Sequence, residues 1–194
     1  RALAAGTTFD RGLEIVAAVR ERTGKPVVVM TYVNVVHSRG AERFAAEIAA
    51  AGADGLIMAD IPLEEALPLK AEVEAAGIGM VLFAAPTTDD ERLDRIAAAE
   101  PVFIYGVNDM GVTGERDDET TRGVALAERV RSRTDVPLVM GVGISRPEQV
   151  AALSGIADGV IIGSAIVRRV LEAATPQAAA ESLRTYTDEI APAL

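Results

Sequence analysis

The sequence predicts an α/β fold built from consecutive strand–helix units. Short aliphatic runs recur roughly every 22 to 35 residues, which is the length of one such unit. The runs are continuously apolar instead of alternating with polar residues, and Ala-rich segments with helical spacing of their apolar residues lie between them. Continuously apolar strands are typical of a parallel sheet that helices cover on both faces.

Six strands and eight helices follow from this pattern. The strands are expected at residues 27–31, 55–60, 79–84, 102–107, 137–142 and 159–163, and the helices at residues 11–22, 41–51, 63–76, 91–99, 121–133, 147–153, 165–174 and 176–190. Thr88 with Glu91, and Ser145 with Glu148, have the spacing of a helix-capping pair. No linker rich in Pro, Gly or Ser separates the units, so one domain over residues 1–194 is the simplest expectation.

Composition excludes several classes of protein. The chain has 194 residues, of which 49% are hydrophobic and 4% aromatic, so its core must be mainly aliphatic. A net charge of -10 argues against nucleic acid or an anionic membrane as partner, and the longest apolar stretches, of about ten residues, are too short to span a bilayer. With no Cys there is no disulfide, thiolate ligand or cysteine nucleophile, which is compatible with a cytoplasmic protein.

Two glycine-containing loops bear on the architecture, because a βα series fits both an open doubly wound sheet and a (β/α)₈ barrel. Gly141 and Gly143 leave the fifth predicted strand, and Gly163 leaves the sixth before Ser164 opens a helix. Each loop alone fits a tight turn, but such loops also bring backbone N–H groups to an oxyanion at a helix N-terminus. Barrel enzymes often bind phosphate after strands 7 and 8, so the two loops together favour the barrel.

The barrel interpretation makes the six visible strands numbers 3 to 8. A barrel of about 250 residues has two βα units more than this chain shows, and the chain starts at Arg1 instead of a Met. We therefore expect an N-terminally incomplete chain. A third glycine-rich loop, Gly111-Val112-Thr113-Gly114, fits a mobile lid over the carboxyl ends of the strands, or a solvated connection whose charges cap the next helix.

Few side chains in the chain are suited to nucleophilic or metal chemistry. Lys25 and Lys70 do not stand at the carboxyl end of a predicted strand, where a Schiff-base lysine belongs. His37 falls in a polar loop after the first strand and is expected to be a surface residue. A Ser-His-Asp triad or a His-rich metal site is therefore not expected.

Three polar side chains lie where they could face a ligand. Asp60 ends the second strand and could orient substrate or accept a proton, or it could cap the helix that contains Glu64 and Glu65. Tyr32 follows the first strand, and Tyr105 lies within the fourth. Tyr105 is equally well explained as a core aromatic.

Six motifs resemble, in order and spacing, those of the tryptophan synthase alpha chain family. They are Met30-Thr31-Tyr32-Val33-Asn34, Ala59-Asp60-Ile61-Pro62-Leu63-Glu64-Glu65, Ala85-Pro86-Thr87-Thr88, Gly111-Val112-Thr113-Gly114, Gly141-Val142-Gly143-Ile144-Ser145 and Gly163-Ser164-Ala165-Ile166-Val167. The resemblance runs from about Arg1 to the C-terminus and implies the same (β/α)₈ TIM barrel.

The resemblance implies retro-aldol cleavage of indole-3-glycerol phosphate to indole and glyceraldehyde 3-phosphate, with no metal or organic cofactor. In the family, an acidic and a basic carboxylate perform the proton transfers, but their positions precede Arg1, so no catalytic residue is assignable in this chain. The family's partner is a pyridoxal-phosphate-dependent beta chain in an α2β2 complex, which receives indole through a tunnel. We do not expect the 194 residues alone to cleave the substrate.

The substrate-binding residues predicted from the residues and the resemblance together are Tyr32, Asp60, Tyr105, Thr113, Gly114, Gly143, Gly163 and Ser164. Family positions that contact phosphate match Gly114, Gly143, Gly163 and Ser164. Tyr105 and Thr113 match positions that line the site and its loop, and Asp60 matches a residue near substrate and partner.

One segment departs from the family pattern. Many members carry a Ser-Arg pair just before the Gly-Val-Thr-Gly loop, where this chain reads Asn108-Asp109-Met110. A carboxylate in place of a cation makes the electrostatic potential near a bound phosphate less favourable, so lid closure or partner signalling could differ. A stand-alone indole-releasing enzyme is therefore an alternative interpretation. Two other hypotheses are another phosphate-binding barrel enzyme, such as an epimerase or isomerase, and a non-catalytic binding module.

Overall fold

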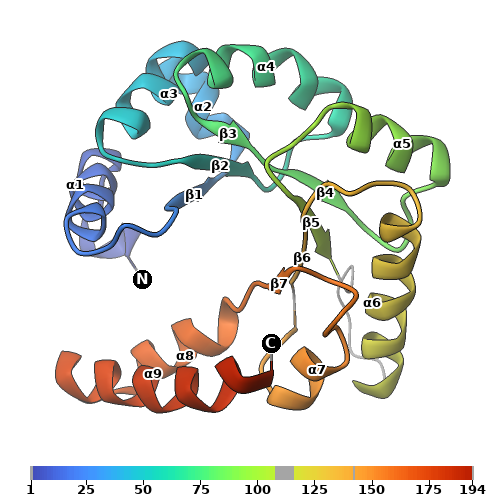
Figure 1. The fold of residues 1–194 in the computed structure, drawn as a ribbon. Helices are drawn as coiled ribbons and strands as arrows, with labels where there is room; N and C mark the ends of the chain where they lie inside the picture. The colour runs from blue at the N-terminus through green and yellow to red at the C-terminus, as the bar shows by residue number, and fades with distance from the viewer. Residues whose placement is uncertain (1, 108–115, 142, 194) are drawn as a thin grey trace. The chain divides into compact units, whose positions relative to one another are not determined.

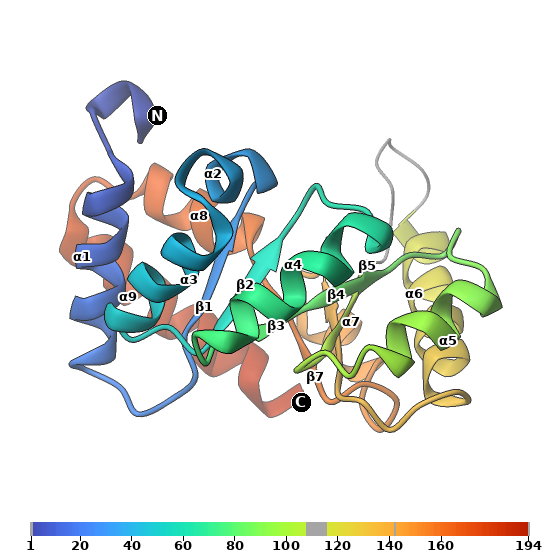
Figure 2. The same cartoon turned by 90° about the horizontal axis from the view of Figure 1, so that it is seen from above.

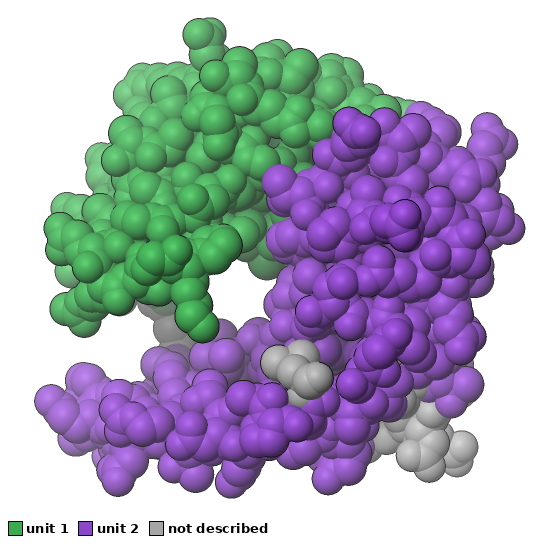
Figure 3. All heavy atoms as spheres, in the orientation of Figure 1, with its two compact units in different colours: residues 1–82 green, residues 83–194 purple. Residues whose placement is uncertain are grey.

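A computed structural model describes residues 2–107, 116–141 and 143–193, with only the backbone of residues 116–120. The chain divides into two compact units, residues 1–82 and 83–194, which Figure 3 colours separately. We describe each unit by itself. The expectation of a single domain over residues 1–194 stays a prediction.

Unit 1 is a three-stranded sheet with its helices. Its elements are η1 (Leu3–Ala5), α1 (Phe9–Arg20), β1 (Val28–Thr31), α2 (Val33–Arg39), α3 (Ala41–Ala50), β2 (Gly55–Met58), α4 (Leu63–Ala75) and β3 (Gly79–Met80). The strand order is β1-β2-β3, and both pairings are parallel. Figures 1 and 2 show α3 and α4 on the same face of this sheet.

The core of unit 1 lies between that sheet face and the helices. Every residue of β2 is buried, and α3 turns Phe44 and Ile48 toward the core. Removing an aliphatic or aromatic side chain of this size from water stabilises the fold by about 1.5–3 kcal/mol. The ring of Phe9 on α1 lies 5.2 Å from that of Phe44, and the guanidinium of Arg39 lies 4.2 Å above the Phe9 ring, so one aromatic contact ties α1 to α2 and α3.

Unit 2 contains a four-stranded sheet that begins at the unit boundary. Its elements are β4 (Leu82–Ala84), α5 (Asp90–Ala98), β5 (Ile104–Val107), α6 (Arg116–Arg131), β6 (Leu138–Gly141), α7 (Pro147–Ala151), β7 (Gly159–Val160), α8 (Ser164–Glu172), α9 (Pro176–Ile190) and η2 (Ala191–Ala193). The order is β4-β5-β6-β7, and β6 pairs in parallel with both β5 and β7. The predicted alternation of parallel strands with helices is therefore confirmed in both units.

An arginine clamp closes the start of the β1–β2 pair. The Arg20 guanidinium donates from Nε to the Gly52 carbonyl at 2.8 Å and forms an ion pair with Asp54. The same carboxylate accepts the N–H of Val27 at 2.6 Å, just before β1 begins. The Asp54 carboxylate, which lies just before β2, thus links the end of α1 to the start of β1.

The same clamp occurs a second time, in unit 2. Arg131 donates from Nε to the Ile156 carbonyl at 3.0 Å and forms an ion pair with Asp158, which accepts the N–H of Leu138 at 2.7 Å. The two clamps have matching local sequence, an Arg-X-Arg-Thr-X-X-Pro segment before the first strand and Ala-Asp-Gly at the second. This internal repeat was missed in the sequence, because it is short and its two halves lie far apart along the chain.

The second clamp predicts a particular pH dependence of stability. The Leu138 N–H, and then Arg131, hold the pKa of Asp158 below its ordinary value. A depressed folded-state pKa means that the carboxylate stabilises the fold above its unfolded pKa of about 3.9 and that this stabilisation is lost as the pH falls through the folded pKa. Asp158→Asn should therefore lower the free energy of unfolding at neutral pH, and the deficit should shrink below about pH 4.

Urea unfolding of both proteins across this pH range measures the effect. Asp135→Asn is the matched control, because Asp135 is exposed in the loop before β6 and takes no part in the clamp. A deficit for Asp158→Asn that stays constant down to the lowest pH would contradict the role of the charge.

Several element boundaries differ from the predictions. The strand expected at 79–84 is interrupted at Val81, so that β3 and β4 belong to different sheets, and the last strand is only Gly159–Val160. The segment after β1, predicted to be a loop, is helix α2, whose first N–H, that of Val33, donates to Asp60 of the loop after β2. His37 therefore lies in a helix, exposed as expected.

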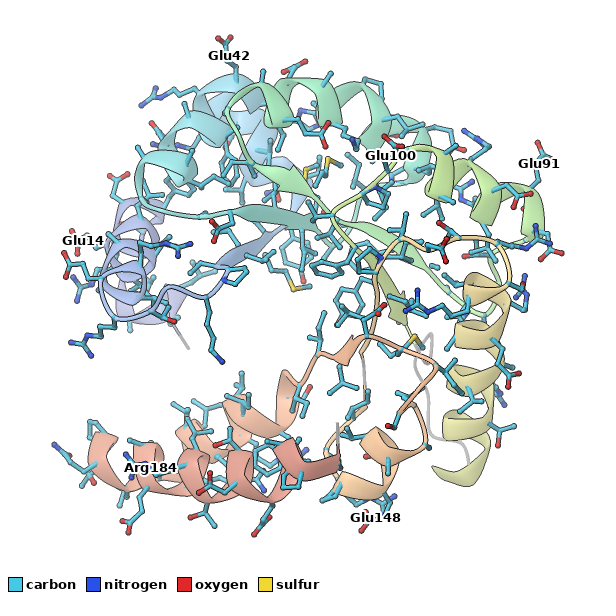
Figure 4. All side chains as sticks on the ribbon, in the orientation of Figure 1. Glu14, Glu42, Glu91, Glu100, Glu148 and Arg184 are labelled. Atoms are coloured by element: carbon cyan, nitrogen blue, oxygen red, sulfur yellow. The ribbon has the colours of Figure 1, made fainter. Side chains whose placement is uncertain are left out.

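Both predicted capping pairs were wrong by one residue. Asp89, not Thr88, caps α5 by accepting the N–H of Arg92 at 2.8 Å. At α7 the N-cap is Arg146, and Gln149 accepts its N–H at 3.1 Å. The predicted acidic partners Glu91 and Glu148 point away from the ribbon into solvent (Figure 4). In both places an alternative polar side chain one position further on reaches the free N–H groups.

No helix among the described residues is long and apolar enough to cross a membrane.

Candidate functional site

The N-terminus of α8 presents free backbone donors. Gly163 is its N-cap, and the Gly163 carbonyl accepts the N–H groups of Ile166 and Val167, both at 3.0 Å. The N–H groups of Ser164 and Ala165 have no acceptor in the part of the chain that the structure describes. A Cβ placed on Gly163 would meet nothing within 4 Å, so the N-cap position itself is uncrowded. Free N–H groups and the helix dipole together favour an anion here.

Hydrogen bonds with Gln149 hold residues 143–146, which follow β6. Gly143 has φ +80°, a left-handed conformation that an L side chain adopts with strain. Gln149 of α7 holds the loop, because its Oε1 accepts the N–H of Ser145 at 2.9 Å and its Nε2 donates to the Gly143 carbonyl at 3.4 Å. The loop carrying one predicted phosphate residue is therefore braced by the helix that follows it.

Tyr105 is part of the core of unit 2. It is 6% exposed, and its ring stacks on Phe83 with the ring centroids 5.0 Å apart. Burial raises the pKa of Tyr105, so the phenol stays protonated at neutral pH. Its hydroxyl has no hydrogen-bond partner within the described residues. A buried donor without a partner is unusual in folded proteins.

Asp60 caps a helix, but not the one predicted. Its Oδ1 accepts the N–H of Val33, the first residue of α2, at 2.7 Å. Helix α4, which contains Glu64 and Glu65, begins after Pro62 without a side-chain cap. The capping alternative in its predicted form is therefore wrong, since the chain folds the helix that follows β1 against the loop that follows β2. Tyr32, the N-cap residue of α2, is 62% exposed.

Two of the predicted residues lie outside the described part of the chain. These are Thr113 and Gly114, together with the Asn108-Asp109-Met110 segment that departs from the family pattern. Among the described residues, Gly143, Gly163 and Ser164 belong to unit 2 with Tyr105, whereas Tyr32 and Asp60 belong to unit 1. No group of three or more potential metal-ligating side chains is found within the described ranges.

Sequence reasoning missed three side chains that support these loops, Gln149, Arg169 and Tyr186. A Gln at the third position of a helix is a recognised capping residue, so Gln149 could have been found by shifting the predicted cap by one residue. Arg169 and Tyr186 lie in helices without a motif, and their contacts are described below.

The fold and these loops define a class of protein, an α/β enzyme-type scaffold of parallel βα units with a candidate anion site after its last two strands. The family model of the tryptophan synthase alpha chain matches residues 1–193. The chain therefore belongs to the tryptophan synthase alpha chain family, and its fold class is the (β/α)₈ TIM barrel, which decides between the two architectures left open by the βα series.

Individual relatives agree with this assignment. The alpha chain of Geotalea daltonii is 40% identical over 169 residues, which are 87% of this chain and 64% of the relative. That of Streptomyces avermitilis is 40% identical over 190 residues, which are 98% of this chain and 69% of the relative. The chain thus spans about two thirds of the length of these curated relatives.

Solved structures show the same fold. A mutant tryptophan synthase alpha-subunit of Pyrococcus furiosus matches with a TM-score of 0.88 and 32% identity, covering 99% of this chain and 77% of that one. The alpha2beta2 tryptophan synthase complex of the same organism matches with a TM-score of 0.87 and 30% identity, covering 99% and 76%.

Proposed function

We propose that this chain binds indole-3-glycerol phosphate and serves its retro-aldol cleavage to indole and glyceraldehyde 3-phosphate, as part of a tryptophan synthase alpha chain. Family membership supports the reaction. The observation that carries the binding role is the open N-terminus of α8, where Ser164 and Ala165 offer free N–H groups in front of Gly163.

The proposed phosphate site uses backbone donors instead of cationic side chains. The phosphate accepts hydrogen bonds from the first turn of α8 and lies near the loop of Gly143, and Gly114 is the proposed contribution of the third loop. The helix dipole favours the dianion without a lysine. Tyr105, Tyr32, Thr113 and Asp60 are the proposed residues around the rest of the substrate.

Cleavage needs an acid that protonates the indole ring and a base that removes a glycerol hydroxyl proton, after which the carbon–carbon bond breaks. We assign neither group to the binding residues named above, and we propose no metal or organic cofactor. The related complexes imply association with a beta subunit. A pyridoxal-phosphate-dependent beta chain in an α2β2 complex is the proposed partner, and the cytoplasm is the proposed compartment.

Binding and turnover can be tested separately. Calorimetric titration of the 194-residue chain with indole-3-glycerol phosphate should show binding, and an assay of indole release should show little turnover, because positioning without an acid and a base forgoes the contribution of both groups. Robust indole release would overturn the second expectation and make Asp60 the leading catalytic candidate. Preferential binding of a phosphosugar without an indole ring would favour an epimerase or isomerase instead.

A further inference from the structure

Helix α9 contacts the loop that follows β6. The Tyr186 hydroxyl donates to the Ser145 carbonyl at 3.0 Å, between residues that are 41 positions apart. Tyr186 is 4% exposed, and its hydrogen bond to the exposed Ser145 is partly buried. Burial raises the pKa of Tyr186, and the phenol remains a protonated donor at neutral pH.

The same tyrosine also contacts α8. The Arg169 guanidinium carbon lies 3.7 Å above the Tyr186 ring, within the range of a cation–π interaction. Arg169 also donates from Nη1 to the carbonyl of Ala165, in the first turn of α8, at 3.2 Å. The Tyr186 side chain therefore contacts two elements. Its hydroxyl bonds the loop after β6, and its ring face packs against Arg169, which bonds the first turn of α8.

These two elements carry the described residues of the proposed phosphate site. Ser145 lies two positions after Gly143, and Ala165 directly follows Ser164. Gln149 fixes the loop from the side of α7, and its hydrogen bonds in the described residues go to Gly143, Ser145 and Arg146, not to α8. Tyr186, together with Arg169, thus connects the two donor groups through side chains.

We propose that Tyr186 is a positioning residue that holds the Gly143 loop and the N-terminus of α8 at the spacing that a phosphate group requires. This proposal rests on the proposed function. A ligand bound by donors from two elements loses affinity when one of them must be ordered on binding, since the ordering opposes association. Tyr186 reduces this cost without touching the ligand.

The test compares Tyr186→Phe with the unmodified chain. The substitution removes the hydroxyl and retains the ring under Arg169, so the fold should be retained. We expect glycerol 3-phosphate, measured by calorimetric titration, to bind about three- to tenfold more weakly, which corresponds to the loss of one net hydrogen bond. The amides of Ser145 and Arg146 should also exchange faster with deuterated water in the absence of ligand.

Thr185→Val is the matched control. Thr185 is exposed on the same helix, and its hydroxyl donates only to the carbonyl of Glu181, at 3.2 Å. It should leave both glycerol 3-phosphate affinity and amide exchange at 143–146 unchanged. Arg169→Met is a second variant, which should weaken glycerol 3-phosphate binding by removing the contact from the other side of the ring.

The possible outcomes separate this proposal from the proposed function. If the unmodified chain binds glycerol 3-phosphate and Tyr186→Phe binds it equally well, the positioning role is overturned and the phosphate site stands. If Tyr186→Phe lowers the unfolding midpoint without changing affinity or the exchange of the loop amides, Tyr186 is purely structural. If the unmodified chain does not bind glycerol 3-phosphate, the proposal of the phosphate site is wrong, and so is the positioning role of Tyr186 that depends on it.

Discussion

Ser164→Asp is expected to weaken binding of glycerol 3-phosphate by roughly 30- to 1,000-fold, while binding of indole changes little. A carboxylate at this position, in the first turn of α8, would meet the phosphate dianion at close range and take up space that the phosphate needs. Repulsion and lost hydrogen bonds together should cost about 2–4 kcal/mol. Indole carries no charge and therefore does not experience the repulsion.

The stability of the variant separates binding from folding. An acidic residue in the first turn of a helix interacts favourably with the helix dipole, so Ser164→Asp should unfold no more readily than the original chain. Ser164→Asn is the matched control, because it adds nearly the same volume without the charge. Calorimetric titration of all three proteins with glycerol 3-phosphate and with indole measures the effect. An equal loss for both ligands would mean that Ser164 supports the fold instead of the phosphate site.

Gly141→Ala is expected to lower the free energy of unfolding by about 1–3 kcal/mol, the usual cost of an overpacked core. A Cβ on Gly141 would lie 2.3 Å from Cε2 and 2.5 Å from the hydroxyl oxygen of Tyr105. Real Cβ atoms do not approach other atoms so closely, so one of the two residues must move. The Tyr105 ring cannot turn away easily, because it is buried and stacked on Phe83.

Gly159→Ala provides the comparison, since Gly159 is also a strand glycine of the same sheet. The nearest atom to a Cβ there is Cγ1 of Val139 at 3.9 Å, an ordinary contact. We expect this substitution to change stability little, or to raise it by about 0.4–1 kcal/mol through the unfolded state. Urea unfolding of both variants measures the difference. Equal stability of the two variants would show that Tyr105 does not need the space at Gly141.

The series of βα units could be predicted from the sequence, because the physical signals behind it are local. Strands such as β2 are buried on both faces and must be continuously apolar, and helices such as α3 must keep one apolar stripe. Gly143 is likewise visible in the chain, because the left-handed turn that it makes favours glycine. Six motifs in order then sufficed to identify the family.

The remaining features depend on residues that only the folded chain brings together. Helix α2 has a weak sequence signal, and the carboxylate that completes its start, Asp60, comes 27 positions after Val33. The arginine clamps and the contact of Tyr186 with Ser145 join residues that are 20 to 41 positions apart. Such pairs have no fixed spacing or period in the sequence, because the number of residues between them is set by intervening helices and loops. The sequence by itself therefore determined the units and the family, and the tertiary structure decided which polar side chains hold the loops of the candidate site in place.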